Sequence, residues 1–416
     1  LQQPFTREND KSIFISPVRI PLLLSANFGE LRIDHFHSGL DIKTQGVTGK
    51  EVVASANGYI YRISVSPGGF GKALYIRHPS GYSTVYGHLE RFTTEIDDYV
   101  KAQQYEKKSY TVTLFPSGEE FRVKQGDIVA YSGNSGSSSG PHLHYEIRKS
   151  ESEIPINPLK FGLGAVDNIP PVIEKLVIYP VNHYTFIDKK NAIKKITVSG
   201  GHGEYYVPPE NEIAISGSAG FGIKAYDLLN DSYNKCAVYS IELSVDSMSI
   251  FKYVMDGFSF NESRYINSHI DYEAYMKENI YVERTFVLPD DKLSVYKNVI
   301  NRGIFNFCDN KIHRVEIIIT DVRNNRSSLK FIVRSETKKP QAVSGVVDKD
   351  LKVMPYNRKN RFTSENISIS IPSGALYDII YFSYKKEGVT GEMLSDLHYI
   401  HNKFTPVHKA YTLSIK

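Results

Sequence analysis

The sequence predicts a mainly β protein, in which an antiparallel β-sheet or barrel-like domain is followed by immunoglobulin-like β-sandwich modules. Three observations carry this prediction. Tyr (29) and Phe (21) are abundant beside many Val, Ile and Thr residues, which strands favour. Short β-like runs recur between Gly- and Pro-rich turns, without convincing helical periodicity. A chain of 416 residues also exceeds one comfortable hydrophobic core, so two or three domains are expected.

The region from Leu22 to about Arg148 is dense in short β-like runs. Turn signals such as Pro67-Gly68-Gly69 and Gly133-Asn134-Ser135-Gly136 separate them. This spacing predicts an antiparallel barrel or sandwich. Residues 95–107 are the one stretch here that favours a helix, and we interpret them as an insertion between two strands. The expected strands are 52–54, 58–65, 73–77, 83–86, 110–114, 127–132 and 142–147.

Clusters of Pro, Asp and Asn mark the expected domain boundaries. The stretch 167–171 ends the first strand-rich region, and Lys338-Lys339-Pro340 ends the second. Within the second region, the run 315–320, a polar turn and the run 328–333 are typical of a closing immunoglobulin-like sandwich. The predicted division is an extension at 1–21, a first domain at 22–162 with an insertion at about 90–122, a sandwich at 170–338 and a small β-rich module at 340–416.

Charge and cysteine content narrow the functional classes. A net charge of +4 is too small to indicate nucleic-acid binding, although a mildly basic surface suits an anionic polymer such as cell wall. No apolar run approaches the ~20 residues needed to cross a bilayer, and a start at Leu1 is compatible with a removed export signal. Cys236 and Cys308 form either one bridge or two buried thiols, and neither belongs to a Cys-rich zinc motif.

The candidate chemistry lies in three short segments that contain histidine. Residues i and i+2 of a strand share a face, so His142 and His144 are expected to project the same way, about 7 Å apart. His37 and Asp41 also share a face if the backbone between them is extended. Three N and O ligands with an open position for water are what catalytic zinc requires. Spacing alone leaves open whether the His-x-His pair supplies two ligands or one ligand and one proton-transfer group. The segments are 35–41, 86–89 and 140–146.

These segments resemble, in order, the motifs of the lysostaphin/LytM-type zinc metallopeptidases. The resemblance also includes the runs 123–130 and 133–136, and it covers roughly residues 22–148, about a third of the chain. The sequence departs from the family pattern in the link between Leu89 and Val123. This link is longer than usual and is expected to reshape the substrate groove.

The resemblance implies one zinc ion, bound by His37, Asp41 and His144. His142 and His88 are then the catalytic histidines that do not bind metal. We expect His142 to activate or orient the water, and His88 to stabilise the oxyanion or pass a proton to the leaving amine. The reverse division of these two roles stays open, because sequence does not fix proton positions.

The implied function is hydrolysis of amide bonds in the stem or cross-link peptides of peptidoglycan, by an exported protein of the periplasm or cell envelope. A cross-link between D-Ala and diaminopimelate is favoured over a glycine bridge. The alternatives are a non-catalytic module that binds wall or activates a partner hydrolase, and a domain held latent by the later modules or by residues 1–21. The presence of all five expected residues favours the enzyme. The carboxy-terminal β-modules are expected to contact an envelope protein or the wall.

The other polar residues near these motifs have simpler interpretations. His35 and Asp34 are expected to be exposed, and His78 an ordinary polar residue at a strand end. Glu146 is a solvated strand end or a partner that orients a ligand. Tyr86 either lines the groove or packs structurally. Beyond residue 165, His398 and His401 are the one pair of histidines at close spacing, and no metal is assigned to them.

Overall fold

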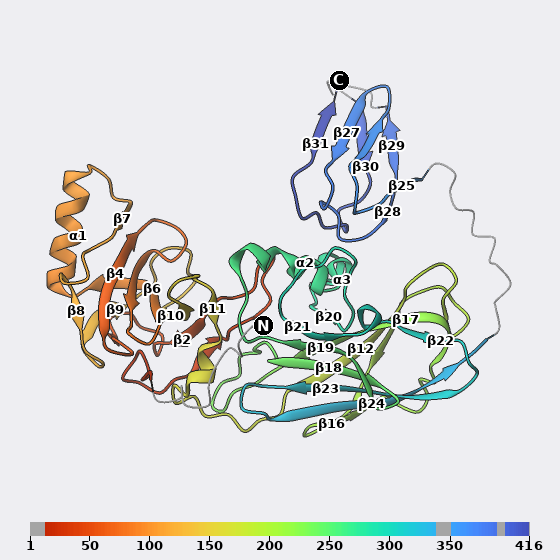
Figure 1. Ribbon diagram of the computed structural model, residues 1–416, viewed down its shortest axis with the longest axis horizontal. Coiled ribbons are helices and arrows are strands. Elements are labelled where there is room, and N and C mark those ends of the chain that lie inside the picture. The colour runs from red at the N-terminus through yellow and green to blue at the C-terminus, as the bar shows by residue number, and fades with distance from the viewer. Residues whose placement is uncertain (1–12, 338–350, 389–395, 416) are drawn as a thin grey trace.

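The computed structural model describes residues 13–337, 351–388 and 396–415. Figure 1 shows a red and orange amino-terminal unit (13–161), a yellow-green to cyan middle unit (172–337) and a smaller blue carboxy-terminal unit (351–415). The predicted mainly β fold is confirmed. Within the described ranges, no helix is both long and apolar enough to cross a membrane.

The amino-terminal unit is built on one large antiparallel sheet. Its main strand order is β1-β2-β10-β6-β5-β4-β7, and the remaining strands pair along it. The predicted runs 58–65 and 142–147 are the strands β4 and β10 of this sheet. The strands are β1 Leu24–Ala26, β2 Leu40–Lys43, β3 Glu51–Val53, β4 Gly58–Val65, β5 Lys72–Arg77, β6 Tyr82–Phe92, β7 Val112–Leu114, β8 Arg122–Val123, β9 Ile128–Ser132, β10 His142–Lys149 and β11 Pro155–Ile156.

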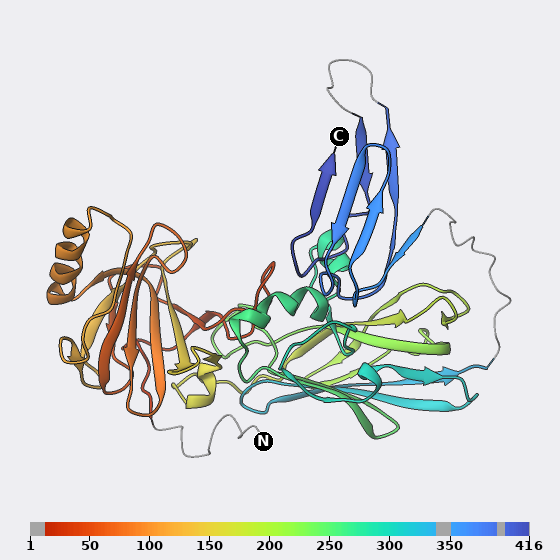
Figure 2. The same cartoon turned by 45° about the horizontal axis from the view of Figure 1, so that its top comes forward.

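The predicted helix at 95–107 is α1 (Thr94–Glu106), which follows β6 directly. Glu95 and Asp97 lie in its first turn, where negative charge is favourable to the helix dipole. Ile96 and Val100 bury its inner face against the sheet. Figure 2 shows α1 at the outer end of the unit, away from the middle unit.

Residues at the start of the described chain pack onto the first sheet. Phe14 and Val18 are buried in its core, and Ile15 N donates to Ser55 O at 2.9 Å. Part of the stretch that we predicted as an extension, 13–21, is therefore packed against this unit, while 1–12 lie outside the described residues.

The middle unit holds a second, larger set of strands, in the main order β14-β12-β17-β24-β23-β18-β19-β21. Its strands are β12 Val172–Pro180, β13 Phe186–Ile187, β14 Lys194–Thr197, β15 Ser199–Gly201, β16 Glu204–Tyr206, β17 Ala214–Tyr226, β18 Ser240–Val245, β19 Met248–Val254, β20 Glu283–Arg284, β21 Tyr296–Val299, β22 Phe305–Phe307, β23 Ile312–Thr320 and β24 Arg326–Ser335. The strands β23 and β24 are the predicted pair around the polar turn.

The structure also has short helices that the sequence did not indicate. Three of them lie at 260–278, and Phe258, just before that segment, packs its ring on Phe28 and Phe36 of the amino-terminal unit. Asp271 caps α3 by accepting from Ala274 N at 3.0 Å. Elements this short carry too few residues for a helical period. The helices are η2 Pro158–Phe161, η3 Phe260–Tyr265, α2 Ile266–His269, α3 Tyr272–Glu278 and η4 Asn301–Gly303.

The carboxy-terminal unit forms three small sheets around its own core. It touches the middle unit through Tyr377, whose hydroxyl donates to Arg264 O at 3.0 Å, and through His408, which stacks on Tyr265 at 4.2 Å between centroids. The predicted boundary at 338–340 lies outside the described residues. The strands are β25 Lys352–Met354, β26 Asn360–Thr363, β27 Ile367–Ile371, β28 Ile380–Phe382, β29 Tyr384–Glu387, β30 Leu397–Ile400 and β31 Thr412–Ile415.

Both cysteines are free thiols, Cys236 buried and Cys308 exposed. The bridge that the sequence left open is therefore wrong, and the buried-thiol alternative holds for Cys236 alone.

Candidate metal centre

The pairing of β2 with β10 brings two of the predicted ligands together. Asp41 and His144 are direct cross-strand partners, and His142 lies opposite Lys43. Residues opposite each other in an antiparallel pair share a face, so Asp41, His142 and His144 all project to one side of the sheet. Gly39 permits this close pairing, because a Cβ there would meet Tyr145 O at 2.4 Å.

His37 reaches the same place from a loop. It precedes β2 and lies outside the strand, so the extended spacing considered from sequence is not what positions it. The loop closes on itself, since His37 N donates to Glu30 O at 2.9 Å and Gly29 N donates to His37 O at 2.8 Å. The ring is buried, and its Nδ1 donates to Asn27 O at 2.7 Å. The backbone carbonyl of Asn27 therefore aims Nε2 at the sheet.

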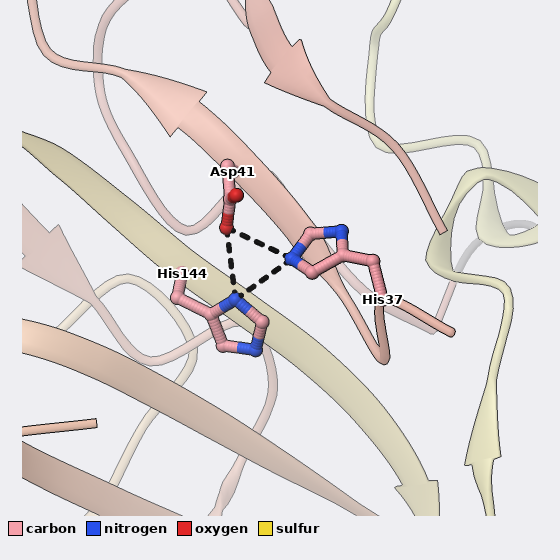
Figure 3. Close-up of side chains that lie close together, drawn as sticks. All are labelled: His37, Asp41 and His144. Atoms are coloured by element: carbon pink, nitrogen blue, oxygen red, sulfur yellow. Dashed lines mark hydrogen bonds and ion pairs between the residues drawn. The ribbon is translucent and has the colours of Figure 1, made fainter. Parts of the chain in front are cut away.

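Three candidate ligand atoms converge at this point (Figure 3). His37 Nε2 lies 3.0 Å from Asp41 Oδ1 and 3.2 Å from His144 Nδ1, and the last two atoms are 2.9 Å apart. Ligands bonded to one zinc ion at about 2.0–2.1 Å in a tetrahedron lie about 3.3 Å from each other. The trio therefore has the spacing of three tetrahedral ligands.

The outer hydrogen bonds fix which nitrogens face inward. His144 Nε2 donates to Glu146 Oε1 at 2.9 Å, just as His37 Nδ1 donates to a carbonyl. In the neutral rings, His37 Nε2 and His144 Nδ1 then carry lone pairs that point at each other and at the Asp41 carboxylate. Three lone pairs aimed at one point need a cation or a proton between them, so the donor set fits a zinc ion.

The pKa shifts of these side chains show which contacts stabilise their charged forms when no metal ion lies between them. Burial opposes ionisation of the Asp41 carboxyl, but hydrogen bonds from His144 and His37 outweigh it and lower the pKa of Asp41. Burial likewise opposes a charged His144, yet hydrogen bonds to Asp41 and Glu146 raise its pKa to about 9. Glu146 is fully buried beside Arg148, and its pKa is lowered to about 2 against the opposing effect of burial.

Zinc affinity is therefore expected to rise with pH. Below about pH 9 zinc displaces a proton from His144, which weakens binding by up to about tenfold per pH unit. Because the folded pKa of His144 lies above its ordinary value, its contribution to metal-free stability is present below about pH 6.5 and is lost as pH rises through about 9. The increase in Tm on adding Zn²⁺ should thus grow from about pH 6.5 to about pH 9. A pH-independent increase would contradict the assignment of this proton.

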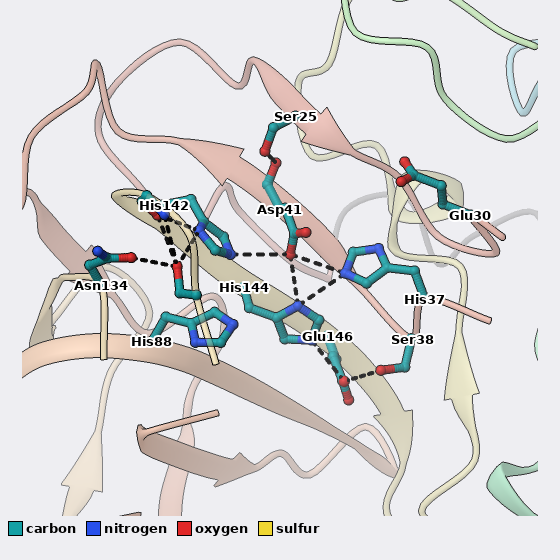
Figure 4. A network of polar contacts seen from close by, with 12 residues as sticks. Ser25, Glu30, His37, Ser38, Asp41, His88, Asn134, His142, His144 and Glu146 are labelled. Carbon is teal, nitrogen blue, oxygen red and sulfur yellow. Dashed lines mark hydrogen bonds and ion pairs between the residues drawn. The ribbon is translucent and has the colours of Figure 1, made fainter. Parts of the chain in front are cut away.

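Two further histidines, His88 and His142, lie beside the three candidate ligands (Figure 4). At His88, strand β6 carries a bulge, since Gly87 and His88 together oppose Ala73 of β5, and the backbone φ of His88 is 58°. Bulges re-aim side chains next to functional sites. The ring of His88 lies 4.7 Å from that of His142 and 5.9 Å from that of His144, measured between centroids.

The tautomers of these two histidines are set in the same way as those of the ligands. His88 Nδ1 donates to Ser135 O at 2.8 Å, and His142 Nδ1 donates to Gly140 O at 2.9 Å. Each ring then presents Nε2 as a proton acceptor, and His142 Nε2 lies 3.6 Å from Asp41 Oδ1. Burial lowers the pKa of His88 to about 4, so this ring is neutral near neutral pH.

The remaining residues considered from sequence have structural roles or are exposed. His35 and Asp34 are exposed and contact each other, and His78 is buried between Asn57 O and the Thr84 hydroxyl. Tyr86 is buried, and its hydroxyl accepts from Ser55 N, so it does not line the site. Glu146 is the partner of His144 rather than a solvated strand end. His398 contacts the Tyr384 hydroxyl and His401 contacts Thr405.

Several supporting residues were missed from sequence. Asn27 holds His37, Arg32 lies 3.5 Å from Asp41 Oδ2, and the Ser38 hydroxyl donates to Glu146. Glu30, which contacts Arg32 at 3.3 Å, has its pKa raised by burial. Only Ser38, inside the motif itself, had a signal that pointed to it.

Replacing Glu146 with Gln tests the outer hydrogen bond. Glu146→Gln keeps the shape but removes the charge that supports His144, so zinc affinity should fall about 10–100-fold. Competition with a chromogenic chelator measures this. Glu153→Gln is the matched control, because Glu153 contacts Arg148 at 3.1 Å without touching His144. Equal losses in both variants would show that Arg148, and not His144, transmits the effect.

These side chains form a candidate mononuclear metal centre with two adjacent acceptor histidines, and the residues around it match a known family model. Residues 35–105 and 115–158 match the model of Peptidase family M23, and residues 351–416 match that of the Zu5-like domain. The amino-terminal unit is thus a peptidase family M23 domain, and we refer to it as the M23 domain from here on.

The curated relatives match about a third of the chain. An uncharacterized metalloprotease of Haemophilus influenzae is 34% identical over 127 residues, which is 30% of this chain and 21% of the relative. The DD-carboxypeptidase/endopeptidase Mpg of Neisseria meningitidis serogroup B is 33% identical, over 30% of this chain and 23% of the relative. The peptidoglycan DD-endopeptidase ShyC of Vibrio cholerae is 29% identical, over 33% and 28%. The chain thus spans about a fifth of the length of the first two relatives.

Solved structures also match about a third of the chain. A variant of the catalytic domain of the prophage-encoded M23 protein EnpA from Enterococcus faecalis is 25% identical, with a TM-score of 0.27, over 36% of this chain and 98% of that one. The catalytic domain of lysostaphin from Staphylococcus simulans is 22% identical, with a TM-score of 0.25, over 32% and 87%.

Proposed function

We propose that the chain is a zinc-dependent endopeptidase that hydrolyses amide bonds in peptidoglycan peptides. The observation that carries the proposal is the convergence of His37 Nε2, Asp41 Oδ1 and His144 Nδ1 within 3.2 Å of one another, with both outer ring nitrogens already bonded. The names of two relatives, a DD-carboxypeptidase/endopeptidase and a peptidoglycan DD-endopeptidase, support the substrate class.

The residues divide the chemistry as follows. His37, Asp41 and His144 would hold the zinc ion, which would supply Lewis acidity to the scissile carbonyl and to the attacking water. His142 accepts a proton at Nε2, because its Nδ1 is committed to Gly140 O and its Nε2 lies beside Asp41. His88 is neutral at rest, so it donates only after its Nε2 has taken up one of the two protons that the attacking water gives up. A protonated ring with a pKa of about 4 is a strong acid and passes that proton readily to a leaving amine.

The bond that we propose is the D,D-amide between D-Ala and diaminopimelate in cross-links, in keeping with the activities in those relatives' names. We further propose an exported protein of the periplasm or cell envelope, whose carboxy-terminal unit contacts an envelope protein or the wall. The non-catalytic alternative requires that the centre lack ligands or acceptors, and all five residues meet here.

Digestion of purified peptidoglycan tests the proposal. With zinc-loaded protein, mass spectrometry should show cross-linked muropeptide dimers converted to monomers; a chelator should stop this, and added Zn²⁺ should restore it. Binding to the wall without any change in fragments would instead establish the non-catalytic alternative. Fragments cut within glycine bridges would overturn the choice of bond while leaving the hydrolase in place.

A further inference from the structure

Three aspartates meet at the junction of the M23 domain and the middle unit, far from the histidines in sequence. Asp167 lies in the connection between η2 and β12, Asp227 follows β17, and Asp321 follows β23. Each offers a carboxylate oxygen, and these oxygens lie within 4.8 Å of one another. Figure 2 shows this yellow connection between the two units.

One of these carboxylates, that of Asp227, has a buried oxygen without a hydrogen-bond partner among the described residues. This oxygen is Oδ1, and Asp227 is 3% exposed. Burial, with repulsion from Asp167 and Asp321, raises the pKa of Asp227 to about 9. Buried charges in proteins are paired or coordinate metals, so this carboxyl stays protonated until a cation replaces its proton.

The aspartates line a small cavity of about 10 Å³, roughly the room for the centre of one water-sized sphere. Arg323 also lines it, but this guanidinium donates to Ala165 O at 2.9 Å and is a single positive charge against three carboxylates. The candidate ligands are all oxygens, which favours a hard divalent cation over zinc. Oxygens bonded to one Ca²⁺ at about 2.3–2.6 Å lie at most about 5 Å apart, as these do.

Two of the three carboxylates are held in place before any ion arrives. Asp321 Oδ1 accepts from Arg323 N at 2.8 Å and from Asn325 N at 2.9 Å, and its Oδ2 accepts from Asn325 Nδ2 at 2.6 Å. Asp167 Oδ1 accepts from Ile169 N at 3.1 Å. A carboxylate oxygen has further lone-pair capacity after such bonds, so both groups remain able to bind a cation.

We propose that Asp167, Asp227 and Asp321 form a Ca²⁺ site that fixes the connection between the M23 domain and the middle unit. The site is also linked to the histidine centre. Asp227 pairs with Cys236 through two backbone hydrogen bonds of 2.9 Å, and the next residue, Ala237, exchanges two hydrogen bonds of 2.8 Å with the Asn27 side chain. The backbone carbonyl of that same Asn27 holds His37. The proposal does not depend on peptidase activity.

Calorimetric titration and thermal unfolding of the full chain test it. The protein is stripped of Ca²⁺ on a chelating resin and reloaded with stoichiometric Zn²⁺, and Ca²⁺ or Mg²⁺ is then added. We expect saturable binding of Ca²⁺ with a Kd of about 10⁻⁴ M or tighter, and a Tm increase of about 2–4 °C. Mg²⁺ should bind more weakly, because it demands a tighter octahedral geometry.

Asp227→Asn should abolish both responses to Ca²⁺, and without Ca²⁺ it should be at least as stable as the parent, because the amide is neutral without having to hold a proton as the buried carboxyl does. Asp231→Asn, an exposed change four residues away, is the matched control and should respond like the parent. The proposal fails if the parent shows no Ca²⁺ response, if Asp227→Asn keeps it, or if Mg²⁺ binds as tightly as Ca²⁺. Zinc content, measured in the same samples, reports separately on the histidine centre.

Discussion

Replacement of His144 by Ala is expected to remove zinc and turnover together. The change deletes one of three ligand atoms. It also leaves the buried carboxylate of Glu146 without the hydrogen bond that His144 Nε2 donates to it. Turnover should fall by about 10³-fold or more, because metal catalysis contributes several kcal/mol and each 1.4 kcal/mol is about tenfold. Metal analysis after gel filtration gives the zinc content, and release of muropeptides gives the rate.

The matched control for this variant is His35→Ala. His35 stands two residues before His37 and is exposed, and its side chain contacts Asp34. It should keep full zinc and full turnover. Full zinc occupancy in His144→Ala would show that the ligand assignment is wrong. A folding defect is separated from ligand loss by near-ultraviolet circular dichroism of the same sample.

Loss of the His88 ring is expected to have the second largest effect on turnover. Unlike loss of His144, it should leave the zinc content unchanged. Zinc should stay bound, since His88 is not among the three converging atoms, while turnover should fall by about 10²–10⁴-fold through loss of acid–base catalysis. His88→Asn is the better variant than His88→Ala. The backbone φ at this position is 58°, a conformation that Asn tolerates and Ala does not.

Turnover and zinc content of His88→Asn, compared with those of the parent, check this prediction. Loss of zinc in His88→Asn would place His88 among the ligands. Unchanged turnover would leave His142 as the sole proton carrier. Because His142 and His88 both present Nε2 as acceptors, comparison of His142→Asn with His88→Asn also settles which ring takes the first proton.

The sequence could predict part of the centre from local geometry. The alternation of a strand places His142 and His144 on one face, and β10 has that alternation. The partnership of Asp41 with His144 joins residues 103 apart, and nothing in either segment encodes that register. It followed only from the resemblance to a family whose motifs occur in this order. The proposed roles of all five residues remain to be tested.

Other features depend on contacts that no local pattern reveals. His37 is aimed by a backbone carbonyl, and any residue at position 27 has one. The bulge at His88 depends on pairing with β5 and on a positive φ in a residue other than Gly. Asp167, Asp227 and Asp321 stand in ordinary turn contexts, and only the folded chain brings their oxygens together.

The middle unit contributes to the position of the candidate centre. Besides the Asn27–Ala237 pair, Phe36 N donates to the Ser263 hydroxyl at 2.9 Å, immediately before His37. Removing residues beyond about 165 would expose Phe28 and Phe36 and free the loop that carries His37. The middle unit therefore supports the loop that carries His37. For this reason, every test above uses the full chain.

The most direct test of the central claim is anomalous X-ray diffraction from crystals of the zinc-loaded full chain, recorded on both sides of the zinc absorption edge. We expect one strong peak about 2.0–2.2 Å from His37 Nε2, Asp41 Oδ1 and His144 Nδ1, with His88 and His142 outside bonding distance. A peak bonded to His142 or His88 in place of His144, or no peak between these side chains, would contradict it.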